Sequence, residues 1–156
     1  ANLPKKLKTN ETYIKFVDYG SDDYFENVKL RNEILREPLG LKLTEEDLKN
    51  DKNYIHLSVF DKKDKVIGTA ILVYLKDHYQ LKQVAISKKW QGRGVGESLL
   101  KFCENYAKNV SIKKIKCHAR QTAIDFYSKN GFKTEGNFFL ENTIPHINMV
   151  KEVNFS

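Results

Sequence analysis

Apolar and polar residues alternate along several short stretches of the chain, and this period of two is typical of half-buried β-strands. A first strand is predicted over Thr12–Val17, where Ile14 and Phe16 lie on one side. Further strands are predicted over residues 54–60, 66–74, 80–86, 112–118, 132–140 and 147–153. The charged residues 61–65 favour a turn between the second and third strands, which would then pair as a hairpin.

Between these strands, apolar residues recur at the three- and four-residue spacing of amphipathic helices. Ser21 is a predicted N-cap for a first helix, which ends at Glu37-Pro38 because proline disfavours helical geometry in the residue before it. Thr44 and Asp47 have the spacing of a capping box and predict the start of a short second helix.

Two more helices are predicted in the second half of the chain. Residues 95–108 carry an apolar stripe at helical spacing. Thr122 and Asp125 are predicted to cap a fourth helix, which ends at Asn130-Gly131. A strand, a crossover helix and a further strand make a βαβ unit, whose ligand site lies at the carboxyl ends of its strands.

Length and composition predict one globular domain over residues 1–156, with 40% apolar residues to build its core. No stretch approaches the roughly 18 apolar residues of a membrane span. Residues 1–6 lack the apolar core of a signal peptide. We therefore expect a cytoplasmic protein without a membrane partner.

The formal net charge of +7 raises the question of a polyanionic partner. The lysines are scattered singly and in pairs, whereas nucleic-acid sites gather basic and aromatic residues into a stripe. We therefore expect no nucleic-acid partner. The two cysteines, Cys103 and Cys117, lie in a helical and a strand pattern, which favours reduced core thiols over a disulfide or a nucleophile.

The densest chemical signal is the glycine-rich stretch 91–96, Gln-Gly-Arg-Gly-Val-Gly, between the apolar run 84–86 and the predicted third helix. Glycines expose backbone N–H groups, and a helix N-terminus attracts anions, so the stretch is interpreted as a cradle for a diphosphate. Glu97-Ser98 follows where a P-loop requires lysine, and the spacing also departs from the dinucleotide fingerprint. A turn that only connects a strand to a helix would have the same local composition.

Two motifs together carry a resemblance to a known family. Gln91, Gly94 and Gly96 form Gln-x-x-Gly-x-Gly after a strand, and Ala123, Tyr127 and Gly131-Phe132 follow downstream at the usual distance. This pattern resembles the acetyl-CoA-binding region of the GNAT N-acetyltransferase superfamily. The resemblance covers residues 55–150, and some landmarks are similar to its ElaA/YjcF-like branch.

The resemblance implies an α+β, three-layer GNAT fold: a mixed, mostly antiparallel sheet of about six or seven strands, a splayed parallel central pair, and about four helices on both faces. It implies acetyl-CoA as cosubstrate, no metal, and a splayed strand whose free backbone groups bond the pantetheine arm. Lysines and Arg93 would lie near the phosphates. The implied cofactor-binding residues are Val84, Ala85, Ile86, Gln91, Gly92, Arg93, Gly94, Val95, Gly96, Arg120 and Tyr127.

The resemblance also suggests roles in catalysis. Tyr127 is the candidate general acid that protonates the departing thiolate. Glu141 and His146 are alternative candidates for the base that deprotonates the acceptor amine. The backbone around Ile86 is the candidate that polarises the acyl carbonyl. His56 could face a pocket, but a half-buried strand histidine is more often structural.

One position departs from the family pattern. Arg120 stands where many relatives carry asparagine, and arginine could bind either a CoA phosphate or an acidic acceptor. Residues 36–41 and 138–146 are predicted to border the acceptor pocket.

The leading functional hypothesis is acetyl transfer from acetyl-CoA to a primary amine of a small molecule. Acetylation of protein lysines or N-termini is an alternative within the same chemistry. A non-catalytic CoA-binding sensor is an alternative from another class. A homodimer is possible, since dimers are common in the resembled family.

Overall fold

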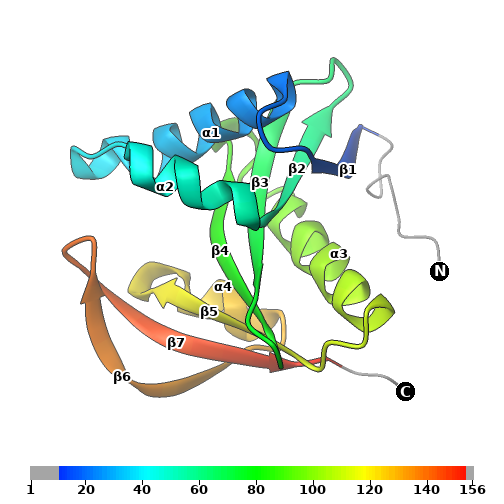
Figure 1. Cartoon of the computed structure of the whole chain (residues 1–156). Helices are drawn as coiled ribbons and strands as arrows, with labels where there is room; N and C mark the ends of the chain where they lie inside the picture. The colour runs from blue at the N-terminus through cyan, green and yellow to red at the C-terminus, as the bar shows by residue number, and fades with distance from the viewer. Residues whose placement is uncertain (1–10, 154–156) are drawn as a thin grey trace.

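The predicted strands pair into one mixed sheet in the order β1-β2-β3-β4-β5-β7-β6, in a computed structural model that describes residues 11–153 (Figure 1). All neighbouring strands are antiparallel except the parallel pair β4 and β5. The strands are β1 (Thr12–Val17), β2 (Ile55–Asp61), β3 (Val66–Tyr74), β4 (Tyr79–Ile86), β5 (Lys114–Arg120), β6 (Lys133–Glu141) and β7 (Ile144–Glu152). The α-helices of the described residues are α1 (Asp22–Leu35), α2 (Glu45–Asn50), α3 (Val95–Asn109) and α4 (Ile124–Lys129).

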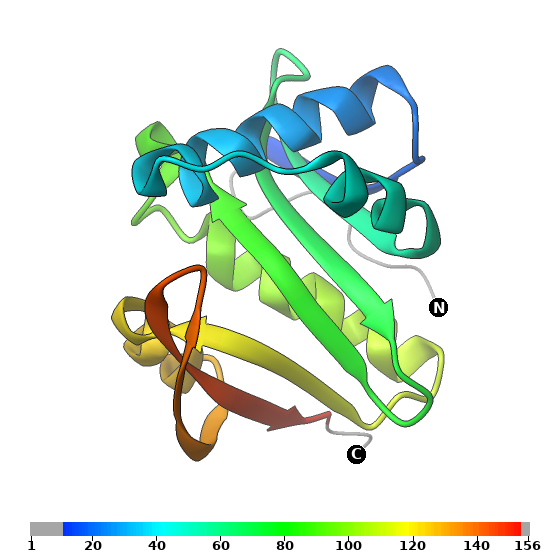
Figure 2. The same cartoon turned by 60° about the vertical axis from the view of Figure 1, so that its left-hand side comes forward.

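These helices cover both faces of the sheet, as expected. Helix α1 packs on β3 and β4, and α3 crosses the opposite face of the same strands (Figures 1 and 2). The core on the α3 side includes Leu57, Leu99 and Met149, and a smaller cluster under α1 includes Phe60 and Leu30. The central strands are buried on both sides, so β3 is a nearly continuous apolar run. The expected fold class is confirmed.

The parallel strands β4 and β5 pair only at their first residues. Tyr79–Leu81 lie opposite Ile115–Cys117, and beyond this point β5 pairs with β7 alone. The strands then diverge as a V that opens toward their carboxyl ends (Figure 2). The pairing of β4 with β3 shifts register near Gln83, whose φ of 50° marks a bulge. A bulge bends its strand and increases its twist, so it helps to separate β4 from β5.

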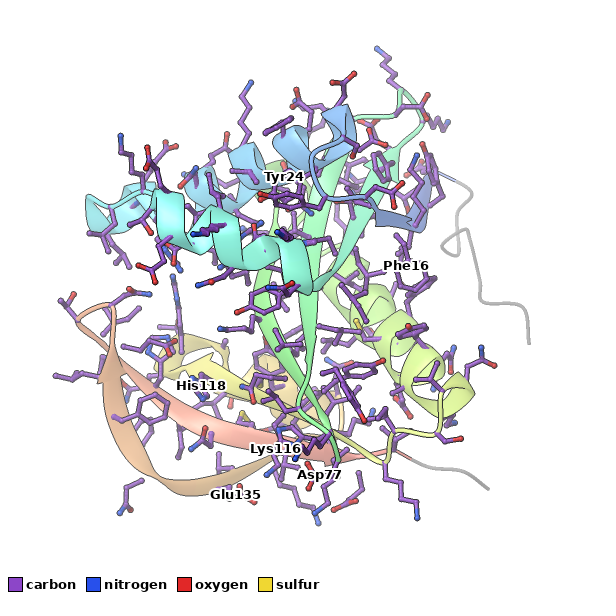
Figure 3. The ribbon with its side chains drawn as sticks, viewed as in Figure 1. Phe16, Tyr24, Asp77, Lys116, His118 and Glu135 are labelled. Atoms are coloured by element: carbon purple, nitrogen blue, oxygen red, sulfur yellow. The ribbon has the colours of Figure 1, made fainter. Side chains whose placement is uncertain are left out.

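A buried polar network supports this bulge from helix α1. Arg31 is fully buried and forms an ion pair with Asp51 at 2.9 Å, and its Nε donates to Oε1 of Gln83 at 2.7 Å. Tyr24 on α1 (Figure 3) donates to the same carboxylate at 2.7 Å. A buried charge is costly unless it is paired and hydrogen-bonded, and Arg31 has both kinds of partner. The sequence patterns did not predict this network.

His56 belongs to the same buried region. Its Nε2 lies 2.7 Å from the carbonyl oxygen of Asp51, and its Nδ1 has no partner among the described residues. Because a carbonyl only accepts hydrogen bonds, Nε2 carries the proton. Burial lowers the pKa of His56, so the neutral ring is favoured. The structural interpretation of His56 is confirmed.

The predicted caps have different outcomes. The Thr44–Asp47 capping box of α2 is formed in full, and Ser21 caps α1. Helix α1 ends at Leu35, and Pro38 lies in a 3-10 turn just beyond. The cap predicted at Thr122 and Asp125 is wrong. Thr122 lies in a 3-10 turn, and α4 starts after Ala123, whose methyl group cannot accept a hydrogen bond.

Residues 141–146 were left as a connection between the strands predicted over 132–140 and 147–153, but most of them belong to strands. Strand β6 continues to Glu141, and β7 begins at Ile144. Asn142 and Thr143 have φ angles of 51° and 68°, the left-handed geometry of a tight two-residue hairpin turn. Asn-Thr is not the usual Asn-Gly signal, which explains the misplaced boundary. The tight turn fixes Glu141 and His146 on neighbouring strands.

Two sequence expectations concern signal peptides and membrane spans. Residues 1–6, on which the absence of a signal peptide was argued, lie outside the described residues. Within residues 11–153, none of the helices combines the length and apolarity that crossing a bilayer requires.

Candidate active site

The glycine-rich stretch 91–96 follows β4 after a 3-10 turn at Lys88–Trp90 and continues into the first residues of α3. Gly92 and Gly94 have φ angles of 74° and 84°, which side chains with a Cβ rarely adopt. A Cβ on Gly96 would lie 3.0 Å from the ring of Phe126. Gly94 is the N-cap of α3 and offers no side chain to the first amides of the helix. The turn therefore presents bare N–H groups and the positive end of a helix dipole.

Gln91 fixes this turn to the end of β4. Its Nε2 donates to the carbonyl oxygen of Ile86 at 2.9 Å. Ser87 N donates to Ile67 O on β3, also at 2.9 Å. Backbone groups of successive strand residues point to opposite sides, so the amide of Ile86 faces away from β3 and toward the opening beside β4.

A cavity of about 680 Å³ lies against the turn. Trp90 and Phe126 give it apolar walls, and Lys129 adds a positive charge. The expected cofactor residues that line this cavity are Val84, Ile86, Gln91, Gly92, Gly94, Gly96 and Tyr127.

The remaining expected cofactor residues lie elsewhere. Ala85 and Val95 are core residues, with exposed fractions of 1% and 3%. The guanidinium of Arg93 lies 4.0 Å from the ring centroid of Trp90 and forms an ion pair with Glu11. Arg120 lines a different cavity.

This second cavity, of about 330 Å³, lies between β4, β5, the β6–β7 hairpin and the ends of α1 and α2. It brings together Tyr127, Glu141, His146 and Arg120, which come from separate elements. Of the two segments predicted to border the acceptor pocket, the first contributes Arg36, and the second contributes Glu141, Asn142 and His146. Other lining residues are Leu35, Asp47, Gln80, Leu81, Lys82, Gln83 and His118.

Three residues, Val84, Ala123 and Tyr127, line both cavities. The cavities therefore meet where β4 and β5 diverge. Burial is the main reason that the pKa of Tyr127 is raised above its ordinary value of 10.0, and the nearby Cys117 and Cys103 add to it. Its hydroxyl accordingly keeps its proton and is available as a donor at this junction.

Glu141 lies between two histidines in the smaller cavity. Nδ1 of His118 donates to Oε1 of Glu141 at 2.9 Å, and Figure 3 shows His118 on β5 beside the hairpin. Nε2 of His146 lies 3.5 Å from the other carboxylate oxygen. Nδ1 of His146 donates to the carbonyl oxygen of Ile144, so in the neutral ring Nε2 holds the lone pair. Either Glu141 or His146 can therefore accept a proton.

His118 was not among the residues predicted for the site, although a signal was present. On β5 the apolar Ile115, Cys117 and Ala119 alternate with Lys116, His118 and Arg120. The polar set faces away from the core, and the last two members reach the cavity. Despite these neighbours, no group of three or more potential metal ligands converges in the part of the chain that the structure describes.

Neither cysteine has the environment of a nucleophile. Cys103 and Cys117 are buried core residues, and burial raises the pKa of each thiol to about 12. Both thiols therefore remain protonated at neutral pH, as expected of core cysteines.

The sequence profile of the acetyltransferase (GNAT) domain matches residues 31–153. The match spans most of the chain and includes both cavities, and the chain therefore belongs to the GNAT family.

Individual relatives agree with this assignment. Bacillus subtilis YyaT is 26% identical over 98 residues, which are 63% of this chain and 66% of that protein. A second protein from the same species, whose name is putative acetyltransferase BSU40680, is 29% identical over 86 residues, which are 55% of this chain and 58% of that protein.

Solved structures share the fold. A Lactobacillus plantarum protein aligns with a TM-score of 0.82 at 24% identity, over 93% of this chain and 100% of that one. Escherichia coli ElaA aligns with a TM-score of 0.75 at 19% identity, over 89% and 99% of the two chains. A GNAT family acetyltransferase from Elizabethkingia anophelis, solved with acetyl-CoA bound, aligns with a TM-score of 0.70 at 19% identity, over 92% and 99%. At these identities the likeness establishes the fold alone.

Proposed function

We propose that this protein transfers the acetyl group of acetyl-CoA directly to a primary amine of a small-molecule acceptor. The observation that carries the proposal is the junction of the two cavities at Val84, Ala123 and Tyr127. One cavity adjoins the glycine turn and the other is lined by charged side chains, so donor and acceptor can meet beside one tyrosine hydroxyl. A volume of about 330 Å³ suits a small acceptor.

The residues present fit acetyl-CoA. The bare amides at Gly94 and Gly96 suit a diphosphate, and Lys129 adds a positive charge nearby. The free edge of β4 past Leu81 leaves backbone groups for the pantetheine amides. Bound there, acetyl-CoA supplies an acyl group activated as a thioester.

Acetyl transfer then needs a neutral amine, a polarised acyl carbonyl and a donor for the departing sulfur, and residues of this chain meet all three needs. An alkylamine with a pKa near 10.4 is neutral in about one molecule per thousand at pH 7, a cost of about 4 kcal/mol, so a base is needed. Glu141 or His146 takes this proton, directly or through water. The amide of Ile86 polarises the acyl oxygen, and Tyr127 is the general acid that protonates the sulfur as the carbon–sulfur bond breaks, so that CoA leaves as the free thiol.

The test is an acetyl-CoA turnover assay against polyamines, amino sugars, amino acids and peptides, following thiol release and the mass of the product. Acetylation of a small amine is expected. Turnover on peptides or proteins alone would favour the alternative of a protein acetyltransferase. Binding of CoA without turnover on any amine would favour a sensor module, and absence of CoA binding would refute the proposal.

A further inference from the structure

Two arginines from distant parts of the sequence converge in the smaller cavity. Arg120 Nη2 donates to the carbonyl oxygen of Leu35 at 2.8 Å, and Arg36 Nη1 donates to the same oxygen at 3.3 Å. This shared acceptor holds both guanidinium groups at the end of α1, where each lines the cavity. A guanidinium has five N–H donors, so most of these donors remain available.

Neither guanidinium forms an ion pair with a residue that the structure describes. Among residues 11–153, the arginines that form ion pairs are Arg31 and Arg93, and no carboxylate lies within 4.0 Å of Arg36 or Arg120. Two half-buried positive charges therefore face one cavity without a direct partner.

The acidic residues of the cavity are occupied by other groups. Asp47 accepts from the backbone amide of Thr44 at 2.9 Å within the capping box of α2. Glu141 accepts from His118 and lies beside His146. Asp47 favours the charged form of Arg36, and Glu141 favours the charged form of both arginines, but neither carboxylate lies within ion-pair distance and the oxygens of Glu141 are directed to the histidines.

The two half-buried charges oppose each other. Burial lowers the pKa of both Arg36 and Arg120, and the charge of Arg36 lowers the pKa of Arg120 further. An anion bound between them would relieve the repulsion and satisfy free N–H donors. The cavity is thus positive near α1 and negative near Glu141.

We propose that the acceptor is an amino acid or a similar amino carboxylate, whose carboxylate binds Arg36 and Arg120 while its amine lies near Glu141. A planar guanidinium matches a carboxylate through paired hydrogen bonds, which favours this anion. The opposite charges of such an acceptor match the two ends of the cavity. The inference rests on the proposed function, because it names the substrate class for that same site.

The test compares acceptors of similar size in which a carboxylate is replaced by a neutral carboxamide, with each rate expressed per neutral amine because the amide also lowers the pKa of the amine. Glycine, β-alanine, γ-aminobutyrate and L-phenylalanine are each assayed beside their own carboxamide. The distance between the amine and the carboxylate varies along this series, whereas the size is matched within each pair. The wild-type protein should show a roughly tenfold or greater preference in kcat/KM for at least one carboxylate over its amide, since bonds between charged groups are at stake. Phosphoethanolamine beside ethanolamine tests a phosphate in the same way.

Variants then assign the preference to the arginines. Arg36→Gln and Arg120→Gln should each reduce that preference by roughly tenfold, mainly through KM, and Arg→Lys should restore part of it. Lys63→Gln, in the exposed turn between β2 and β3, removes the same charge outside the cavity and should leave the preference intact. Equal rates on carboxylates and amides, or a preference that survives both variants, would overturn the inference. An arginine-dependent preference for phosphate alone would also overturn it.

Calorimetry separates failure of this inference from failure of the proposed function. The amino acids are titrated into the CoA-bound protein, with the carboxamides as controls. Binding of the carboxylates that is lost in Arg120→Gln supports the anion site even if no amine is acetylated, in which case the transferase proposal fails alone. Acetylation of neutral amines without carboxylate binding refutes the anion site and leaves the transferase proposal standing.

Discussion

The two cavities differ in whether the backbone or the side chains form them. The larger one depends on backbone: glycines with left-handed φ angles, a helix start without a capping side chain, and a strand edge without a neighbour. The smaller one depends on side chains, with charged groups contributed by α1, α2, β4, β5 and the β6–β7 hairpin. The first can bind a ligand common to a whole family, and the second can differ in each member.

This difference predicts how each cavity responds to substitution. Changes at the turn should affect binding of the acetyl donor and spare discrimination among amines. Changes in the smaller cavity should do the opposite.

Replacing Gly94 by glutamate should cause the largest loss. The new residue must adopt a φ near 84° and places a negative charge at the diphosphate cradle. We expect the affinity for acetyl-CoA, measured by calorimetry, to fall by roughly a hundredfold or more. Gly20→Glu is a matched control, because Gly20 also has a left-handed φ of 80° but lies before α1 in open surroundings. Normal binding by Gly94→Glu would contradict the cradle.

Asp51→Asn should weaken the buried network that supports the bulge of β4 at Gln83, next to both cavities. It leaves Arg31 buried with a neutral partner, and breaking a buried ion pair costs about 3–5 kcal/mol of unfolding free energy. Denaturant unfolding monitored by circular dichroism measures this loss. Asp77→Asn, which removes an exposed carboxylate beside His78, should leave stability unchanged. If the two variants are equally stable, the network does not hold the bulge at Gln83.

Tyr127→Phe should separate catalysis from binding. Loss of the hydroxyl removes the donor at the junction, so kcat should fall by roughly tenfold or more with little change in CoA affinity. Because burial raises the pKa of Tyr127, no loss of activity from its ionisation is expected below its ordinary pKa of 10.0. Steady-state kinetics over a pH series measures both effects, and an unchanged kcat would remove Tyr127 from the mechanism.

Glu141→Gln should give a smaller defect that depends on pH. With the carboxylate gone, His146 remains to accept the proton, so kcat/KM should fall by about tenfold at pH 7. The defect should shrink as the pH approaches the pKa of the acceptor amine, because less of the amine then needs deprotonation. His146→Gln, assayed in parallel, identifies the base by the larger loss. A defect that does not vary with pH would count against a base role for Glu141.

The larger cavity, which depends on backbone, was the more predictable of the two. Its glycines are required by local geometry, since Gly94 must be left-handed and Gly96 must lie against Phe126. Such requirements produce a short sequence motif that can be recognised without knowledge of the fold. Alternating patterns and short apolar runs located the seven strands of the described residues for a similar reason, because such patterns depend on near neighbours.

The smaller cavity, which depends on side chains, was only partly predictable. Tyr127 was expected there from the family resemblance, and Glu141 and His146 from their chemistry and their place at the ends of predicted strands. His118 and the pairing of Arg36 with Arg120 were not expected. These contacts depend on where the sheet order brings β5, β7 and the end of α1, which no local spacing encodes. The Arg31–Asp51 pair was missed for the same reason.

The meeting of both cavities at Tyr127 has a kinetic consequence. If the two reactants occupy separate cavities as proposed, both can be bound at once, and the acetyl group need not be stored on the protein between two half-reactions. We therefore expect a ternary complex and intersecting initial-rate lines, where a ping-pong enzyme would give parallel ones.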